Sequence, residues 1–297
     1  MAMTGVDGLL ERAAAGEPLE PVDRIAIAES RDVLALGMAA DIVKRRRHGA
    51  GVTFVRVATI AVAEAAHAEW PSAAGEVRIE DPLVDVDAAV SAVESVAARA
   101  AAQVPVTGFS LADVERVTGA DAARAEQLLA RFAKAGLTAI AAAPLDELQA
   151  PREMLDAAAA AGLRVLRLTV ERSPAEMRFE QIERASTLCQ AGRFEAFAPL
   201  PRRVAAATPT TGFEDVRQVA LARLLVGVPR IQVDWRLYGP KLAQVGLTFG
   251  ADDVDDVSPL EETGEGRRRA PLEEIRRNIT AASGEPIERD GLFGPRR

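Results

Sequence analysis

Short apolar runs alternate with amphipathic helical stretches along most of the chain. Eight runs resemble buried strands: VTFVRVA at 52–58, EVRIE at 76–80, PVTGF at 105–109, LTAIAAA at 137–143, RVLRLTV at 164–170, FEAFAPL at 194–200, RIQVDWRL at 230–237 and LTFGADDV at 247–254. Between them, stretches such as DAARAEQLLARFAKAG and FEDVRQVALARLLVG repeat apolar residues at helical spacing, and the second ends at a Gly-Val-Pro stop. This alternation of strands and helices predicts parallel βαβ units.

Two architectures are built from such units. A doubly wound sheet that binds a nucleotide carries a glycine-rich phosphate loop after its first strand, and no such loop follows the run at 52–58. Eight units over about 250 residues fit a (β/α)₈ barrel of the TIM type. The sequence therefore predicts an α/β fold, with an N-terminal helical segment at 1–47 packed on a barrel at 48–297. Near the end we expect a flexible loop at 261–269, a terminal helix at 271–282 and an extended tail, ERDGLFGPRR.

One segment has the pattern of a helix-turn-helix. In SLADVERVTGADAARAEQLLARFAKAGL, residues 110–137, two helical stretches flank a turn around Gly119. The second stretch mixes acidic and basic residues, whereas binding to phosphates needs several uncompensated Lys or Arg side chains. The segment is therefore interpreted as ordinary barrel helices.

Composition and charge narrow the class of protein. The 297 residues are 48% hydrophobic and 27% charged, an ordinary globular composition. A net charge of −8 argues against nucleic-acid and membrane partners, and the basic runs at 44–47 and 267–269 are expected to be solvated. No stretch approaches about eighteen uninterrupted apolar residues and no signal pattern is present, so a cytoplasmic protein is expected. With a single cysteine, Cys189, and two separated histidines, His48 and His67, neither a disulfide nor a metal site is expected.

Four segments resemble a known family from end to end. LLERAAAGEPLEPVDRIAIAESRDVLALGMAADIVKRRRHGAGVTF resembles the opening of radical S-adenosylmethionine (SAM) enzymes of menaquinone and deazaflavin biosynthesis, and is most similar to aminofutalosine synthases. The other three segments are GRFEAFAPLP at 192–201, TGFEDVRQVALARLLVGVPRIQVDWRLYGPKLAQVGLTFGADDVDD at 211–256, and LEEIRRNITAASGEPIERDGLF at 272–293. The resemblance implies common ancestry and the barrel fold.

The chain departs from this family where its members hold their cofactor. In the family, the first strand leads into a C-x₃-C-x₂-C loop whose thiolates hold a [4Fe–4S] cluster, and the open iron binds SAM. Here the matching residues are Arg56–Ile60 and then AVAEAAHAEW, without a cysteine. Without three thiolates no such cluster forms, and reductive cleavage of SAM has no electron source. Cys189, on a later helix, is expected to be a buried packing residue.

Other family positions have changed as well. The paired glycines after the second strand match Ile79–Asp81, the glycine-rich turn after the fourth matches Ala141–Pro144, and a Tyr-Gly-His stretch matches Val170–Ser173. Each added Cβ removes room that glycine leaves for a ligand to approach the backbone. We therefore expect no cofactor, with both the [4Fe–4S] and the SAM site lost.

The reacting face of a barrel is formed by the loops that follow its strands. The polar residues expected there are Arg56, Thr59, Glu80, Asp81, Glu171, Arg172, Arg202, Arg203, Gln232, Asp234, Trp235, Asp252 and Asp253. The candidate catalytic carboxylates are Glu171 and Asp234. The candidate ligand-binding residues are Arg172, Gln232, Asp252, Asp253 and Glu80, and Glu80 with Asp81 could serve as a general acid–base pair.

Two points stay open at this stage. Alternation places Gln232 and Asp234 on one face of their strand and Val233 and Trp235 on the other, without showing which face points inward. Asp252 or Asp253 could bind a ligand hydroxyl at the mouth of the last strand, or could cap a helix after a turn at Gly250.

Two functions are compatible with these observations. The chain could be a cluster-less homologue, inactive in radical chemistry, that acts as a binding or scaffold partner in the futalosine pathway of menaquinone biosynthesis. Its partner would be an active radical SAM paralogue or a second copy, and this role predicts an exposed apolar patch. Alternatively, a redox-neutral enzyme or sensor would use the barrel mouth to act on a small, polar, futalosine-like metabolite. SAM binding without a cluster is a third option, which the lost glycines disfavour.

Overall fold

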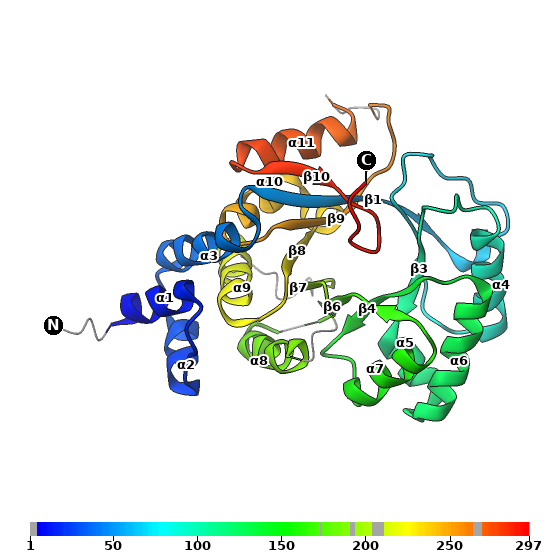
Figure 1. The fold of residues 1–297 in the computed structure, drawn as a ribbon, viewed down its shortest axis with the longest axis horizontal. Helices are drawn as coiled ribbons and strands as arrows, with labels where there is room; N and C mark the ends of the chain where they lie inside the picture. Colours follow the sequence, from blue (N-terminus) through cyan, green and yellow to red (C-terminus); the bar gives the residue numbers. More distant parts are fainter. Residues whose placement is uncertain (1–4, 173, 191–193, 204–210, 264–268, 297) are drawn as a thin grey trace. The chain divides into compact units, whose positions relative to one another are not determined.

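The computed structural model describes residues 5–172, 174–190, 194–203, 211–263 and 269–296. Within these residues, eight parallel strands close into an α/β barrel of the TIM type, in the order β1-β2-β3-β4-β6-β7-β8-β9, with β9 returning to β1 (Figure 1). The short strands β5 and β10 pair with β4 and β1. The barrel predicted from strand–helix alternation is confirmed.

The elements have the following bounds. The strands are β1 (Gly51–Ile60), β2 (Glu76–Ile79), β3 (Val106–Ser110), β4 (Ala139–Pro144), β5 (Arg164–Val165), β6 (Arg167–Val170), β7 (Ala196–Pro201), β8 (Arg230–Asp234), β9 (Asp253–Val257) and β10 (Glu285–Glu288). The α-helices are α1 (Val6–Ala15), α2 (Pro21–Glu29), α3 (Val33–His48), α4 (Val86–Ala97), α5 (Leu111–Thr118), α6 (Ala122–Ala135), α7 (Pro151–Ala160), α8 (Arg178–Cys189), α9 (Gly212–Leu225), α10 (Trp235–Thr248) and α11 (Pro271–Ala281). Two 3₁₀ turns are η1 (Val62–Glu64) and η2 (Ala175–Met177).

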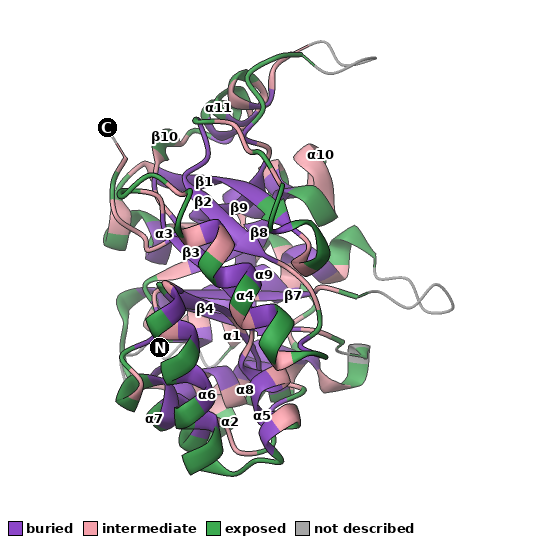
Figure 2. Cartoon of the chain, turned by 90° about the vertical axis from the view of Figure 1, so that its right-hand side faces the viewer, coloured by how far each residue is buried: buried purple, intermediate pink, exposed green. Residues whose placement is uncertain are grey.

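The contacts divide the chain into two compact units. The first comprises residues 1–53, 170–254 and 276–286, and the second comprises residues 54–169, 255–275 and 287–297. In the first unit α3 packs on α9 and α10 packs on β8, whereas in the second α6 packs on α4, α5 and α7. The strands carry mostly buried residues, and many exposed residues lie on the helices (Figure 2). The helical N-terminal segment is present as α1–α3, and its boundary at residue 47 stays a prediction.

Local sequence signals explain several helix ends. Asp121 begins α6, its carboxylate accepting from the backbone N–H groups of Ala123 and Arg124, and Gly136 ends it in the left-handed region (φ 103°). The helix-turn-helix pattern forms α5 and α6, which connect β3 to β4 through a turn at Gly119 (φ 65°). They are barrel helices, as interpreted.

The last two predicted strands are partly wrong. Trp235–Leu237 begins α10 because the carboxylate of Asp234 accepts from the N–H of Leu237 at 2.9 Å and caps the helix. Residues 247–248 end α10, and β9 begins only at Asp253. The terminal helix is confirmed as α11, and most of the expected loop at 261–269 lies outside the described residues. None of the described helices combines the length and the apolar character needed to span a membrane.

Candidate ligand site at the carboxyl ends of the strands

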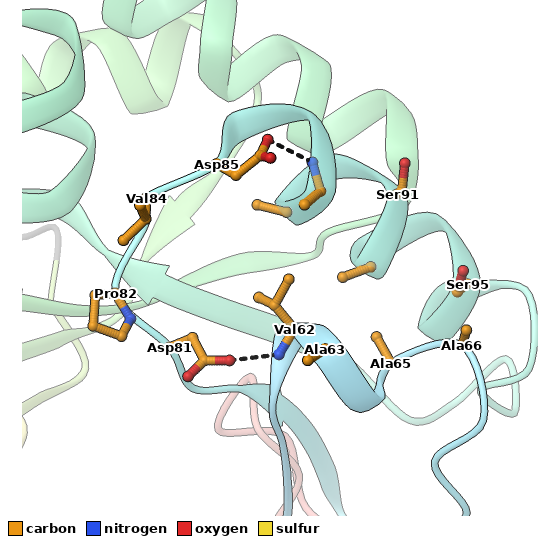
Figure 3. Close-up of a pocket in the computed structure, with 13 residues that line it drawn as sticks. Val62, Ala63, Ala65, Ala66, Asp81, Pro82, Val84, Asp85, Ser91 and Ser95 are labelled. Carbon is orange, nitrogen blue, oxygen red and sulfur yellow. Dashed lines mark hydrogen bonds between the residues drawn. The ribbon is translucent and has the colours of Figure 1, made fainter.

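The loop after β1 consists of small apolar residues folded against α4. Its short turn η1 begins where the carboxylate of Asp81, just after β2, accepts a hydrogen bond from the N–H of Val62 (Figure 3). Asp81 was expected to belong to an acid–base pair, and in the structure it caps this turn.

An apolar cavity of about 600 Å³ lies between this loop and α4 (Figure 3). It is lined mainly by alanines together with Val62, Pro82 and Val84. The two carboxylates in its wall are already engaged, since Asp81 caps η1 and Asp85 accepts from the N–H groups of Asp87 and Ala88. A second hollow of about 510 Å³ is lined by Thr59, Glu64 and His67 among others.

The side chains of this loop do not fit an iron–sulfur cluster. Residues 61–70 contain one imidazole, His67, and no thiol. Cys189 is buried in α8, and burial raises the pKa of its thiol to about 12, which keeps it protonated at neutral pH. Within the described ranges, no group of three His, Cys, Asp or Glu side chains could hold a metal ion. Cys189 is the buried residue that the sequence predicted.

A chain of arginine–carboxylate contacts lies at the carboxyl ends of β6, β7 and β8. The backbone N–H of Arg203 donates to the carbonyl of Glu171, so the loop after β7 continues the pairing with β6. The Glu171 carboxylate lies 2.6 Å from Nε of Arg203 and 3.9 Å from Nε of Arg202. Nη1 of Arg202 in turn lies 3.5 Å from the carboxylate of Asp234. The structure thus brings together both candidate catalytic carboxylates, with the guanidinium of Arg202 between them.

Tyr238 and Arg178 lie beside this chain of contacts. The hydroxyl of Tyr238, on α10, donates to the carbonyl of Pro201 at 2.6 Å. Burial, and then the charge of Asp215, raise the pKa of Tyr238 well above its ordinary value, so the phenol stays protonated and acts as a donor. Arg178, at the start of α8, lies 3.5 Å from the carboxylate of Asp215 on α9.

The open question about β8 has a clear answer. A Cβ on Gly246 of α10 would lie 3.4 Å from Val233, so Val233 faces the helix layer. Gln232 therefore points to the opposite side, where its side-chain amide donates to the carboxylate of Asp253 at 2.6 Å. Thr53 also donates to that carboxylate. Gln232 and Asp253 are buried and already paired with each other.

Asp252 lies at the wrong end of its strand for a ligand at the barrel mouth. It precedes β9, where it accepts hydrogen bonds from the side chain of Arg223 and from the N–H of Ile231. For Asp252 both interpretations are wrong, because it neither lies at the mouth nor caps a helix. For Asp253 ligand binding stays a prediction. The turn at Gly250 (φ 103°) is confirmed.

The remaining candidates occupy different places. Glu80 and Thr59 lie at the carboxyl ends of their strands, as expected, and Arg172 is exposed after β6. The prediction that Arg56 lies at the barrel mouth is wrong, because its guanidinium lies 2.9 Å from the carboxylate of Glu288 in β10.

Sequence reasoning missed a buried cluster of charges in the second unit. Each member lies within a strand and is at most 5% exposed: Glu76, Arg78, Thr107, Arg167 and Asp255. Arg78 binds Glu76 at 2.8 Å and Asp255 at 2.8 Å, and Arg167 binds the same two carboxylates at 3.0 and 2.9 Å. A charged pair at alternate positions of an apolar strand, as in Glu76-Val77-Arg78, was the available signal.

The sequence of this chain is similar to parts of several known enzymes. No protein-family profile matches the chain. The aminodeoxyfutalosine synthase of Thermus thermophilus is 33% identical over 135 residues, which cover 40% of this chain and 36% of that protein. The 5-amino-6-(D-ribitylamino)uracil–L-tyrosine 4-hydroxyphenyl transferase of Methanopyrus kandleri is 37% identical over 106 residues, covering 33% of this chain and 28% of that protein. The matches span about a third of the length of these curated relatives.

Solved structures share the barrel fold of this chain. Methylornithine synthase superposes with a TM-score of 0.63 over 94% of this chain and 97% of its own, at 15% identity. The hydrogenase maturase HydG from Carboxydothermus hydrogenoformans gives a TM-score of 0.64 over 95% and 79%, at 13% identity. At these identities the structures show the fold alone. The chain is a distant homologue of radical SAM enzymes.

In this radical SAM homologue, the two regions described above differ in chemistry. The loop after β1 offers an apolar cavity, and the loops after β6, β7 and β8 offer arginines and carboxylates. In the second arrangement the guanidinium groups are paired with the carboxylates of Glu171 and Asp234.

Proposed function

We propose that this radical SAM homologue works by binding and not by reductive cleavage of SAM, as a partner of an active radical SAM enzyme in menaquinone biosynthesis. The loop after β1 supports the first part, since its side chains offer no thiolate to a cluster. The similarity to an aminodeoxyfutalosine synthase supports the choice of pathway.

An exposed apolar stripe on α3 carries the proposal of a protein partner. Leu34, Met38 and Ile42 lie four residues apart on one face of the helix and are 69%, 70% and 52% exposed. The opposite face, with Leu36, is buried, and α3 packs on α9. Contiguous exposed apolar surface of this kind marks interaction sites.

The test is binding of the full-length chain to the active radical SAM enzyme of the same pathway. We expect association at micromolar concentrations in titration calorimetry, and a loss of at least about tenfold in affinity for Met38→Glu, because burial of a large apolar side chain at an interface contributes this much or more. The matched control is Leu260→Glu, which changes an apolar side chain that is 56% exposed in the second unit.

Two results would contradict this role. One is the absence of association at tens of micromolar, and the other is unchanged affinity in Met38→Glu. A dimer of this chain alone, lost in Met38→Glu, would instead assign the stripe to a second copy of the chain.

The arrangement of Glu171, Arg202 and Asp234 favours a second candidate function. A redox-neutral enzyme or sensor would hold a small polar metabolite between these groups. We expect the thermal midpoint to rise with a nucleoside of the futalosine type and the rise to shrink in Glu171→Gln and Asp234→Asn. Asparagine still caps α10, so Asp234→Asn removes the charge while leaving the helix start intact. Equal shifts in both variants and the wild type would remove these residues from the site.

A further inference from the structure

Arg178 is a buried cation whose hydrogen-bonding capacity is largely unused. The residue is 8% exposed, and its contact with Asp215 runs from Nη2 at 3.5 Å, the outer limit of a hydrogen bond. Its Nε and Nη1 atoms are buried and have no hydrogen-bond partner. Guanidinium keeps its charge in proteins, so these N–H groups cannot be neutralised by losing a proton. Buried donors on a charged group are costly unless an acceptor completes them.

A second unpaired group lies one helical turn further along α8. The side-chain oxygen of Gln181 is buried and accepts no hydrogen bond, and the residue is 3% exposed. Residues three apart on a helix lie on the same side, so the side chains of Gln181 and Arg178 share one side of α8. Together they present donors for an oxyanion and an acceptor for a hydroxyl or amine beside it.

Arg178 begins α8, the helix that follows β6 and the loop with Glu171. Its partner Asp215 lies on α9, and the phenol of Tyr238 on α10 donates to the carbonyl of Pro201, the last residue of β7. Gln218 of α9 fixes the start of α8 by donating to the backbone carbonyl of Arg178 at 3.1 Å. The nearby guanidinium of Arg217 is engaged by the carbonyls of Ala28 and Ser30, and therefore does not compete for the same ligand.

We propose that Arg178 and Gln181 form a binding subsite for the oxyanion of a small hydroxylated or amino metabolite, either a carboxylate or a phosphate. Nε and Nη1 donate to two oxygens of the anion, and Gln181 accepts from its hydroxyl or amine. The subsite is independent of the proposed protein partner, and it specifies the ligand chemistry of the second candidate function.

The test compares the full chain with Arg178→Met in thermal unfolding, using inorganic phosphate and glycolate as probes against sodium chloride at equal ionic strength. We expect one probe to raise the midpoint of the wild type, and which one responds distinguishes phosphate from carboxylate. The apparent affinity should fall at least about tenfold in Arg178→Met, because charge-assisted hydrogen bonds are lost. The control is Arg124→Met, an exposed arginine of α6 that should leave the shift unchanged.

Without any ligand, the two possible roles of Arg178, a ligand site and a structural ion pair, predict opposite changes of the thermal midpoint in Arg178→Met. A ligand site left empty predicts that Arg178→Met raises the midpoint, since it removes unsatisfied buried donors. A structural ion pair with Asp215 predicts that the midpoint falls. A lowered midpoint, together with no response of the wild type to either probe at tens of millimolar, would overturn the subsite. If the subsite fails but the chain still binds its protein partner through the apolar stripe on α3, the proposed partner role stands.

Discussion

At the scale of residues, the buried charges of the second unit form a closed set of ion pairs. Arg78 and Arg167 are each shared between Glu76 and Asp255, so removing one carboxylate leaves guanidinium groups buried without full compensation. We expect Asp255→Asn to lower the free energy of unfolding by about 3–5 kcal/mol, as in other broken buried pairs. Urea unfolding measures this, with Asp87→Asn as a control because that carboxylate is 86% exposed. A loss no larger than the control's would contradict the account.

The same cluster predicts how stability depends on pH. Burial alone would raise the pKa of Asp255, but the charges of Arg167 and Arg78 outweigh it and hold the pKa well below its ordinary value, and the pKa of Glu76 is lowered in the same way. A carboxylate whose pKa is lower when folded stabilises the fold above its unfolded pKa and loses that contribution as the pH falls. The free energy of unfolding should therefore drop below about pH 4–5, and less steeply in Asp255→Asn. Parallel curves would contradict this assignment.

Single residues also show where sequence reasoning was limited. Glu171, Asp234 and Arg202 could be assigned to the barrel mouth because they follow apolar strands directly. Asp252 could not be placed, because its position depends on where a strand begins. The unused donors of Arg178 arise from contacts among α8, α9 and α10, and its position in an amphipathic helix gives no sign of them.

At the scale of elements, the turn at Gly250 connects α10 to β9, in the part of the barrel where the predicted elements were least accurate. Gly250 has φ 103°, and an added Cβ would lie 2.9 Å from Cβ of Ala40 and 2.9 Å from Cβ of Arg223. Gly250→Ala should lower the free energy of unfolding by about 2–4 kcal/mol through strain and overpacking. Gly227→Ala is the matched control, since its Cβ would meet open space. Equal losses of unfolding free energy in the two variants, measured by urea unfolding, would show that the turn does not require glycine at position 250.

The loop after β1 gives a prediction of its own. Asp81 caps η1 at Val62, so Asp81→Ala should cost about 1 kcal/mol and speed hydrogen exchange at the Val62 amide. Glu64→Gln, an exposed change within η1, should leave that exchange rate unaltered. If Asp81→Ala leaves the exchange rate as it is in the wild type, the loop does not depend on this cap.

Most elements could be predicted, and the failures have a physical cause. The apolar runs between residues 52 and 200 were identified as strands because glycine, proline or capping residues mark where the helices between them begin and end. In α10, Gly239 has φ 71° and Pro240 follows it, yet the helix resumes beyond this kink to Thr248. The run LTFGADDV at 247–254 was interpreted as a strand from its apolar residues, but its first two residues end α10 and β9 begins only at Asp253.

At the scale of the whole molecule, the chain combines a closed parallel α/β barrel with a loop after β1 that carries no thiol. The strand order and the structural likeness to methylornithine synthase show the retained fold. The loop after β1 lines an apolar cavity, and arginine–carboxylate contacts follow β6, β7 and β8. Fold alone does not fix function, so the account depends on the chemistry of these side chains.

The most direct test of this account is anaerobic reconstitution of the full chain with ferrous iron, sulfide and a reductant, followed by measurement of bound iron and of SAM cleavage. An active radical SAM enzyme treated in parallel is the positive control. The account predicts no iron above background and no cleavage product, because a [4Fe–4S] cluster needs several thiolates and the chain has one cysteine. A stoichiometric cluster with SAM cleavage would contradict it.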